Sequence, residues 1–262
     1  METKIDLEEG WGIIQKEITK LINTLEGNPD SPLYGLIYST VYTICQEKPT
    51  DDKCKVLYSR YENVYKNYLE SKVLPAIQEK NDDVSMLQEL VKRWANHKVM
   101  VTKLARYFNY LDRYHIPRNK LPSLKDVGFD CFRKIVYEKM NVKARDAVIV
   151  LINREREGNE IDKGLVKDVL EVFVGIGNEK GKDKLDYYVN DFETAFLSDL
   201  VDYYTRKGSK EITALECLQM EKDRVSYYLH PNTEEKLLKE VQGEVVPENA
   251  QQDLEKEMEC KA

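Results

Sequence analysis

The chain has 262 residues, and its 40 lysines and arginines against 47 aspartates and glutamates give a net charge of −7. Apolar residues make up 42% of it, which is enough for one large core or two smaller ones. The acidic balance disfavours a nucleic-acid-binding protein, because such proteins present basic surfaces to the phosphates. No apolar run reaches the roughly 18 residues of a membrane span, and the acidic start of the chain is unlike a secretory signal. We therefore expect no nucleic-acid partner and no membrane.

The numbers of cysteines and of turn-forming residues further restrict the compartment and the fold class. The cysteines are odd in number, none has CxxC spacing, and no signal peptide precedes them, so we expect reduced thiols in the cytoplasm and nucleus. They are Cys45, Cys54, Cys131, Cys217 and Cys260. Only 12 glycines and 8 prolines occur, which is too few for the many turns of an all-β protein. Long helices are the expectation.

Two helices are predicted at the N-terminus. Apolar side chains at steps of three and four residues predict a first helix over residues 6–25, and Gly27 ends it. The second helix is predicted to begin at Ser31, whose hydroxyl can cap it, with Pro32 in the first turn, where no backbone donor is needed. We expect this helix to end before Pro49.

Longer helices follow, and prolines mark their expected ends. A third helix carries an apolar stripe over residues 57–69, and Pro75 should kink or break it. A long helix over residues 84–115 is expected to stop before Pro117. The remaining helices are predicted over residues 124–140, 143–157 (with Gly158 after its end), from 162 onward, 185–204 and 212–229. No segment alternates as a strand does between turns, so the predicted fold class is all-α.

Two parts of the chain show a weak sequence similarity at a constant offset, which we call the internal echo. Residues 192–196 resemble residues 61–65 at an offset of 131, since both place aromatic rings four residues apart. The same offset carries Val41 and Tyr42 onto Val172 and Phe173. Aromatic helical stripes are common, so chance explains the echo as well as a duplicated module of several helices does.

No catalytic, metal or nucleotide motif is present. The glycine-rich residues 175–181 follow a helix instead of a strand, and their third glycine is one position late for a dinucleotide loop. His97, His115 and His230 are isolated and lack metal-ligand spacing. A modest basic patch over residues 92–106 has no recognition motif beside it. We expect a chain that is not an enzyme, with no catalytic residues, no metal and no cofactor.

The second predicted helix is unusual, because it is apolar around most of its circumference. Tyr34, Tyr38 and Tyr42 stand at i, i+4 and i+8 and so share one face. Two interpretations stay open. The helix is central and buried by its own domain, or one face packs inward and the tyrosine face meets another protein. A second aromatic segment, residues 107–115, suggests a composite docking surface together with this helix.

Several long segments, found in order from residue 11 to about residue 241, resemble the N-terminal region of a cullin. They are residues 90–101, 110–114 and 155–162, together with the spacing Tyr34, Tyr38, Tyr42. The resemblance is strongest to plant cullins of the Skp/F-box class. It implies a stalk of stacked helical cullin repeats, here two bundles. Residues 1–140 would form the first repeat, residues 141–242 the second, and residues 243–262 a flexible acidic tail.

The resemblance also implies a partner and a site. Cullins are scaffolds of multisubunit ubiquitin ligases, and the tip of their first repeat docks a BTB-fold adaptor of the Skp type that carries an F-box receptor. Carried over position by position, the adaptor-binding residues would be Tyr34, Gly35, Ile37, Tyr38, Val41, Tyr42, Leu111, Tyr114 and His115.

Three departures from the family pattern affect this expectation. Gly35 stands where the family usually has a larger side chain, and His115 stands where it usually has an aromatic ring, so both would reduce the apolar contact area. The chain also stops at Ala262, before the region that holds the RING-box protein, so we expect no RING-box partner. The leading hypothesis is a non-catalytic adaptor-binding module of ubiquitin-dependent protein catabolism. The alternatives are a competitor of full-length cullin, and a helical-repeat protein that has lost adaptor docking and binds another partner.

Overall fold

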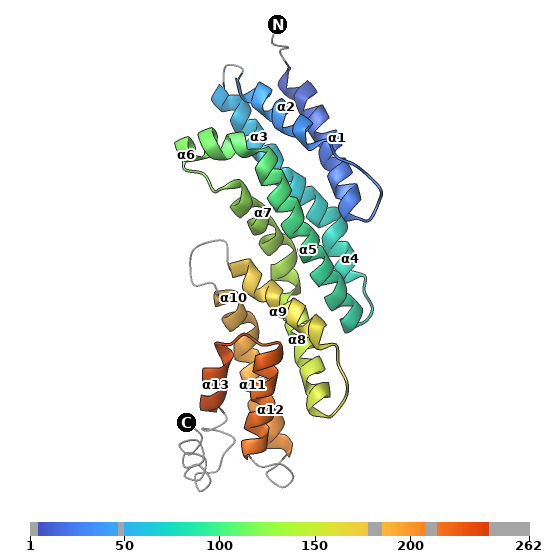
Figure 1. Cartoon of the computed structure of the whole chain (residues 1–262), viewed down its shortest axis with the longest axis vertical. Coiled ribbons are helices and arrows are strands. Elements are labelled where there is room, and N and C mark those ends of the chain that lie inside the picture. Colours follow the sequence, from blue (N-terminus) through green and yellow to red (C-terminus); the bar gives the residue numbers. More distant parts are fainter. Residues whose placement is uncertain (1–4, 47–49, 178–184, 208–213, 241–262) are drawn as a thin grey trace. The chain divides into compact units, whose positions relative to one another are not determined.

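The computed structural model describes residues 5–46, 50–177, 185–207 and 214–240, and these form helices and no strand (Figure 1). The all-α expectation is confirmed. The chain divides into two compact units, one of Met1–Asn81 with Lys92–Met140 and the other of Asp82–Val91 with Asn141–Ala262. Both α5 and α8 run from one unit into the other. That each unit is a cullin repeat, with a tail over residues 243–262, stays a prediction, and the tail lies outside the described residues.

The helices follow one another closely in the first half of the chain. They are α1 (Leu7–Leu25), α2 (Tyr34–Gln46), α3 (Thr50–Tyr68), the π-helical turn η1 (Leu69–Val73), α4 (Leu74–Gln78), α5 (Asp83–Tyr107), the π-helical turn η2 (Leu111–His115) and α6 (Ile116–Asn119). Within the first unit α1 packs on α2, α2 on α3, and α3 on α7. The second half contains α7 (Leu124–Phe132), the π-helical turn η3 (Arg133–Tyr137), α8 (Glu138–Arg156), α9 (Lys163–Gly177), α10 (Asp186–Tyr188), the π-helical turn η4 (Val189–Glu193), α11 (Thr194–Lys207), α12 (Ala214–Tyr227) and α13 (Thr233–Glu240).

Helix ends follow the capping residues in three predicted places. Asp6 caps α1 by accepting a hydrogen bond from the Glu8 amide, 3.3 Å away. Gly27 and Gly158 both adopt left-handed backbone, with φ of +90° and +86°, directly after α1 and α8. In both cases the glycine amide and the following amide bond back to carbonyls of the last turn, which is a Schellman arrangement.

Prolines do not end the helices as predicted. Pro75 lies within α4 and Pro117 within α6, and each follows a π-helical turn, η1 or η2. In a π-helical turn the amide bonds to the carbonyl five residues back, as the Ile116 amide does to Leu111. The shifted bonding accommodates the missing proline donor, so the chain continues in helical form to Asn119. The long helix itself ends earlier than expected, at Tyr107.

Two further boundaries differ from the sequence expectation. No break separates residues 140 and 143, because α7 continues through η3 into α8. The prediction placed the last helix at residues 212–229, of which residues 212–213 are not described, and missed α13. Glu234 and Glu235 in the first turn of α13 were the available signal, since acidic residues favour a helix N-terminus.

The offset of 131 residues relates helix bounds as well as residue types. It carries Leu7–Leu25 onto Glu138–Arg156 at both ends, Gln46 onto Gly177, and Gly27 onto Gly158. It also carries Arg93 onto Arg224, and each arginine contacts a glutamate at the end of α1 or α8, Glu26 or Glu155, although the offset itself carries Glu26 onto Glu157. Each of these carboxylates also accepts a hydrogen bond from a tyrosine hydroxyl. These agreements favour duplication of a module over chance.

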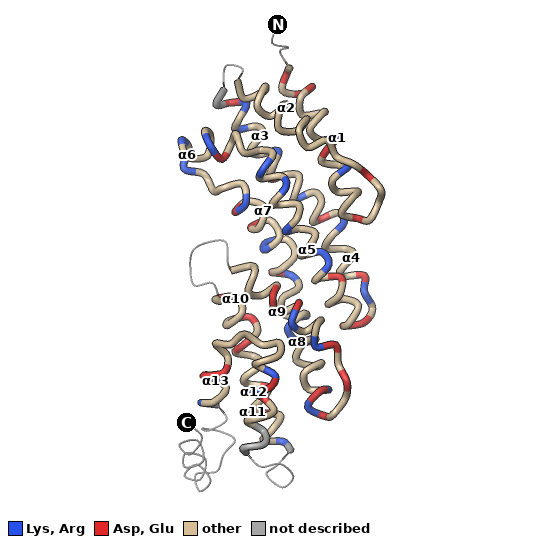
Figure 2. The backbone as a smooth tube through the Cα atoms, in the orientation of Figure 1, with Lys and Arg blue, Asp and Glu red and all other residues tan. Residues whose placement is uncertain are grey.

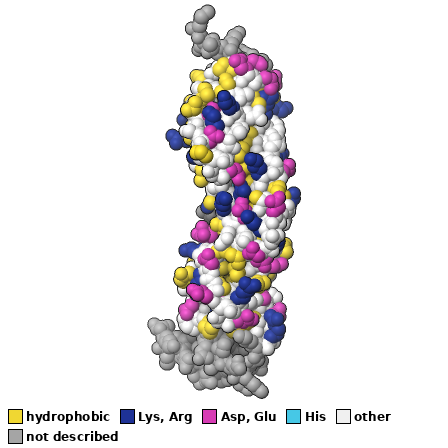
Figure 3. Space-filling model, turned by 90° about the vertical axis from the view of Figure 1, so that its right-hand side faces the viewer, with side chains coloured by type: hydrophobic (Ala, Val, Ile, Leu, Met, Phe, Trp, Pro, Cys, Tyr) yellow, Lys and Arg dark blue, Asp and Glu magenta, His cyan; other side chains and the backbone are white. Residues whose placement is uncertain are grey.

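A buried ion-pair cluster joins three helices of the second unit. The Glu221 carboxylate is fully buried and accepts two hydrogen bonds from Arg156, at 3.0 and 3.2 Å. Arg224 and Tyr204 donate to the same carboxylate at 2.6 and 2.9 Å. Every charge in the cluster has a partner, as buried charges require. Outside it, charges of both signs are distributed along the helices (Figure 2) and mix with apolar side chains on the face drawn in Figure 3.

Candidate functional site

The N-terminus of α2 is held by a side chain from α1. The Leu33 amide, just before the helix, donates a hydrogen bond to Glu17 Oε2 at 2.6 Å. Hydrogen bonds from Lys20 and from this amide lower the pKa of Glu17, so the carboxylate is charged where the helix dipole favours a negative charge. The helix begins at Tyr34, three residues after the predicted Ser31, because this capping group comes from α1.

The three predicted tyrosines lie along one flank of α2. Tyr38 and Tyr42 are 45% and 47% exposed, and Tyr34 is half-buried. The Tyr34 ring stacks on Tyr107 of α5 with centroids 4.8 Å apart. Lys103 Nζ donates to the Tyr34 hydroxyl at 2.9 Å and lies 5.0 Å from the ring centroid. These contacts fix the ring at the edge of the helix.

The other end of this flank meets the segment after α5. The Tyr42 ring packs edge-on against Tyr110, with centroids 5.9 Å apart, and Tyr110 contacts Tyr114 at 4.7 Å. Tyr114 is 55% exposed. We call the six rings that line this flank the aromatic surface: Tyr34, Tyr38, Tyr42, Tyr107, Tyr110 and Tyr114. The two aromatic segments lie together on this flank, and that they form a docking surface stays a prediction.

Four of the predicted site residues do not lie on this surface. Ile37, Val41 and Leu111 are fully buried, and His115 is 5% exposed. They support the tyrosine-bearing backbone from beneath. The expectation that His115 reduces the contact area is therefore wrong, since its ring faces the interior and lies near Tyr58.

Gly35 is exposed on α2, and a methyl group added there would meet nothing within 4 Å. The position is open, so its lack of a side chain serves no close approach. The sequence-based site omitted Tyr107, Tyr110 and Lys103. The density of aromatic residues before Pro117 was the signal for the two tyrosines, whereas only the fold brings Lys103 to Tyr34.

The chemistry of the aromatic surface is that of a binding surface. Burial raises the pKa of Tyr110, so its hydroxyl stays protonated at neutral pH. Among the residues described, no group of three or more histidine, cysteine or acidic side chains is placed to hold a metal ion. The rings offer a large, stiff apolar area whose hydroxyls still tolerate water.

Comparison with known proteins identifies the family. The cullin alpha solenoid domain matches residues 11–262. The chain belongs to the cullin family. It is 48% identical over 267 residues to Cullin-1 from Oryza sativa subsp. japonica, which covers 97% of this chain and 35% of that protein. It is 38% identical over 258 residues to Cullin-like protein 3 from Arabidopsis thaliana, which covers 93% of this chain and 98% of that protein.

The relatives differ in how far they extend beyond the matched region. Putative cullin-like protein 2 from Arabidopsis thaliana is 43% identical, and the match covers 67% of it. The chain therefore spans about a third of rice Cullin-1 and nearly all of Cullin-like protein 3. Cullins as a family are scaffolds of ubiquitin ligases and not catalysts themselves. No helix in the described part of this cullin chain is long and apolar enough to cross a membrane.

Proposed function

We propose that this cullin-family chain is a non-catalytic scaffold module that docks a Skp-type adaptor, carrying its F-box receptor, through the aromatic surface. The observation that carries the proposal is the exposure of Tyr38, Tyr42 and Tyr114 in one unit of a cullin chain. Large aromatic side chains left open on a monomer mark protein interfaces. The module would act in ubiquitin-dependent protein catabolism.

The aromatic surface is prepared for binding before a partner arrives. Tyr34 is already stacked on Tyr107, and Tyr42 already contacts Tyr110, so these rings lose little side-chain entropy on docking. The buried side chains of Ile37, Val41 and Leu111 hold the backbones that carry them. A partner with a complementary apolar groove would meet a nearly rigid face.

Co-elution tests this proposal. The purified chain is mixed with a Skp-type adaptor at micromolar concentration and run on a sizing column, where a complex is expected. The double variant Tyr38→Lys/Tyr42→Lys places two charges in the docking face and should abolish the complex. Tyr227→Lys is the matched control, since Tyr227 is 61% exposed on α12 of the second unit and is not one of the six rings of the aromatic surface. A wild-type chain that never co-elutes with the adaptor contradicts the proposal.

A second candidate function has one observation in its favour. The bare Gly35 position leaves open space on the exposed side of α2, where a larger side chain would extend the apolar contact. A cullin-like chain that has lost adaptor docking would use this face for a different protein. If the Gly35→Met variant gains adaptor binding that the wild-type chain lacks, this second function is favoured. If both the wild-type chain and the Gly35→Met variant bind the adaptor, the chain retains docking and can compete with full-length cullin for the adaptor.

A further inference from the structure

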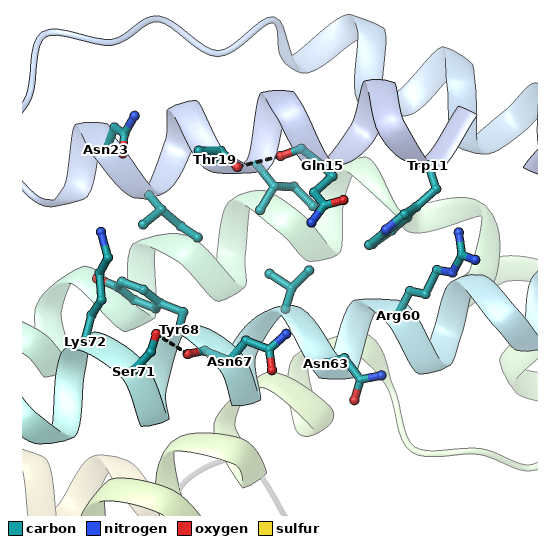
Figure 4. Close-up of a pocket in the computed structure, with 13 residues that line it drawn as sticks. Trp11, Gln15, Thr19, Asn23, Arg60, Asn63, Asn67, Tyr68, Ser71 and Lys72 are labelled. Atoms are coloured by element: carbon teal, nitrogen blue, oxygen red, sulfur yellow. Dashed lines mark hydrogen bonds between the residues drawn. The ribbon is translucent and has the colours of Figure 1, made fainter. Parts of the chain in front are cut away.

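A groove of about 430 Å³ lies between α1 and α3 in the first unit (Figure 4). It runs from Trp11 and Arg60 at one end to Asn23 and Lys72 at the other. The groove forms between α1 and α3 because both of these helices pack on α2. The groove is built from other side chains than those of the aromatic surface.

Its lining alternates apolar and carboxamide side chains. Ile22 and Val64 are half-buried and contribute apolar surface. Gln15, Asn63 and Asn67 contribute amide groups that form no side-chain hydrogen bond with another described residue. A carboxamide both donates and accepts, which matches the alternating groups of a peptide backbone. The lining therefore suits an extended chain segment.

The charges of the groove have one sign. Arg60 and Lys72 line it, and no acidic side chain does. The Arg60 guanidinium lies 5.4 Å from the Trp11 ring centroid, and its Nη2 donates to the rim residue Glu8. Its Nη1 is buried and forms no hydrogen bond within the described part of the chain. A carboxylate of a partner would reach Arg60 through the part of the side chain that stays exposed, since the side chain as a whole is 23% exposed.

We propose that this groove is a docking site for an extended acidic peptide segment of a partner protein. Arg60 and Lys72 are twelve residues apart on continuous helical chain, which is about 18 Å at 1.5 Å per residue. An extended peptide covers that distance in roughly five or six residues. The segment would place one carboxylate at each end and an apolar side chain between them, over Ile22 and Val64.

Panning a phage-displayed library of random decapeptides on the intact chain tests this proposal. Enriched peptides should carry two acidic residues five or six positions apart, with an apolar residue between them. The most enriched peptide, labelled with fluorescein, should bind the chain saturably in fluorescence anisotropy. Arg60→Glu and Lys72→Glu should each weaken that binding at least tenfold, and Lys72 is exposed, so its replacement leaves the fold intact.

Two control variants show whether peptide binding depends on this groove. Lys55→Glu makes the same charge change at an exposed position of α3 outside the groove and should leave the affinity unchanged. Tyr38→Lys/Tyr42→Lys should also bind the peptide normally, so failure of adaptor docking and failure of this proposal are distinguishable. Enrichment of basic peptides, or equal enrichment on the Arg60→Glu chain, would overturn the inference.

Discussion

His97 lies in the core of the first unit, where its Nε2 is 2.8 Å from the Gly128 carbonyl oxygen. Its ring is fully buried and packs against Trp94 and Phe132. Burial lowers the pKa of His97 to about 4, since a charged imidazole would lose its hydration. It is therefore a neutral core residue, which agrees with the lack of metal-ligand spacing around it in the sequence.

His97 makes stability depend on pH in a defined direction. Its folded pKa is below the ordinary value near 6.5, so protons bind the unfolded chain more strongly. The stabilisation is present above pH 6.5 and is lost as the pH falls toward 4. Between pH 7 and pH 5 the loss is about 2 kcal/mol in the free energy of unfolding. NMR titration of the ring protons checks this, and a midpoint near 6.5 for His97 in the folded chain contradicts it.

Gly128 of α7 lies close to Val101 of α5. A Cβ added there would lie 2.7 Å from Val101 Cγ2 and 3.3 Å from Tyr65 Cζ, both in a fully buried region. Gly128→Ala should therefore cost about 1–3 kcal/mol in the free energy of unfolding, measured by urea denaturation. Val101→Ala removes the nearest clash, so the double variant should be less destabilised than the sum of the two single variants. Strict additivity would show that the clash does not exist.

At the scale of the helix, one glycine within α1 and one just after its end should respond with opposite signs. Gly27 has φ of +90°, which costs an alanine about 1–2 kcal/mol. Gly12 lies on the exposed side of α1 with nothing within 4 Å of an added methyl group, so alanine there should stabilise by up to about 1 kcal/mol. Thermal unfolding of the two variants checks both. A lower Tm for Gly12→Ala, or an unchanged Tm for Gly27→Ala, contradicts the helix account.

Local rules predicted most helices and several of their ends. Asp6, Gly27, Gly158 and Asp162 act in their own turns, so the sequence alone identifies them. The sequence did not predict that the helical chain continues through Pro75 and Pro117, because a helix tolerates proline when a π-helical turn precedes it. Whether a π-helical turn forms before a proline depends on the tertiary packing around η1 and η2, which a local sequence pattern does not contain. The start of α2 was missed for a similar reason, since its capping carboxylate is Glu17 of another helix.

The candidate site was only partly predictable, because α2 is apolar around most of its circumference. Periodicity grouped Tyr34, Tyr38 and Tyr42 correctly, but it also grouped them with Ile37 and Val41. Which of these face outward depends on where α1 and α3 pack, and the structure buries the two aliphatic residues. The resemblance to cullins supplied the segment around residue 111 and did not separate exposed Tyr114 from buried Leu111.

At the scale of the whole molecule, the 131-residue offset relates helices of the two units that carry different surfaces. The 131-residue offset preserves both ends of α1 in α8, the end of α2 in α9, the glycine after the first helix and one arginine that contacts a glutamate. It does not preserve the exposed tyrosines, since Tyr38 and Tyr42 correspond to Val169 and Phe173, which are buried. The offset thus relates part of the helical framework, while the aromatic surface belongs to the first unit.

The central claim is that the exposed tyrosines of the first unit form the adaptor-docking face. Isothermal titration of a Skp-type adaptor into the wild-type chain, Tyr42→Lys and the matched control Tyr227→Lys tests it most directly. Truncating or charging an interface anchor costs at least about 2 kcal/mol, which is roughly a 30-fold loss of affinity. We expect that loss for Tyr42→Lys and wild-type affinity for Tyr227→Lys. Equal affinity of all three chains for the adaptor would contradict the claim.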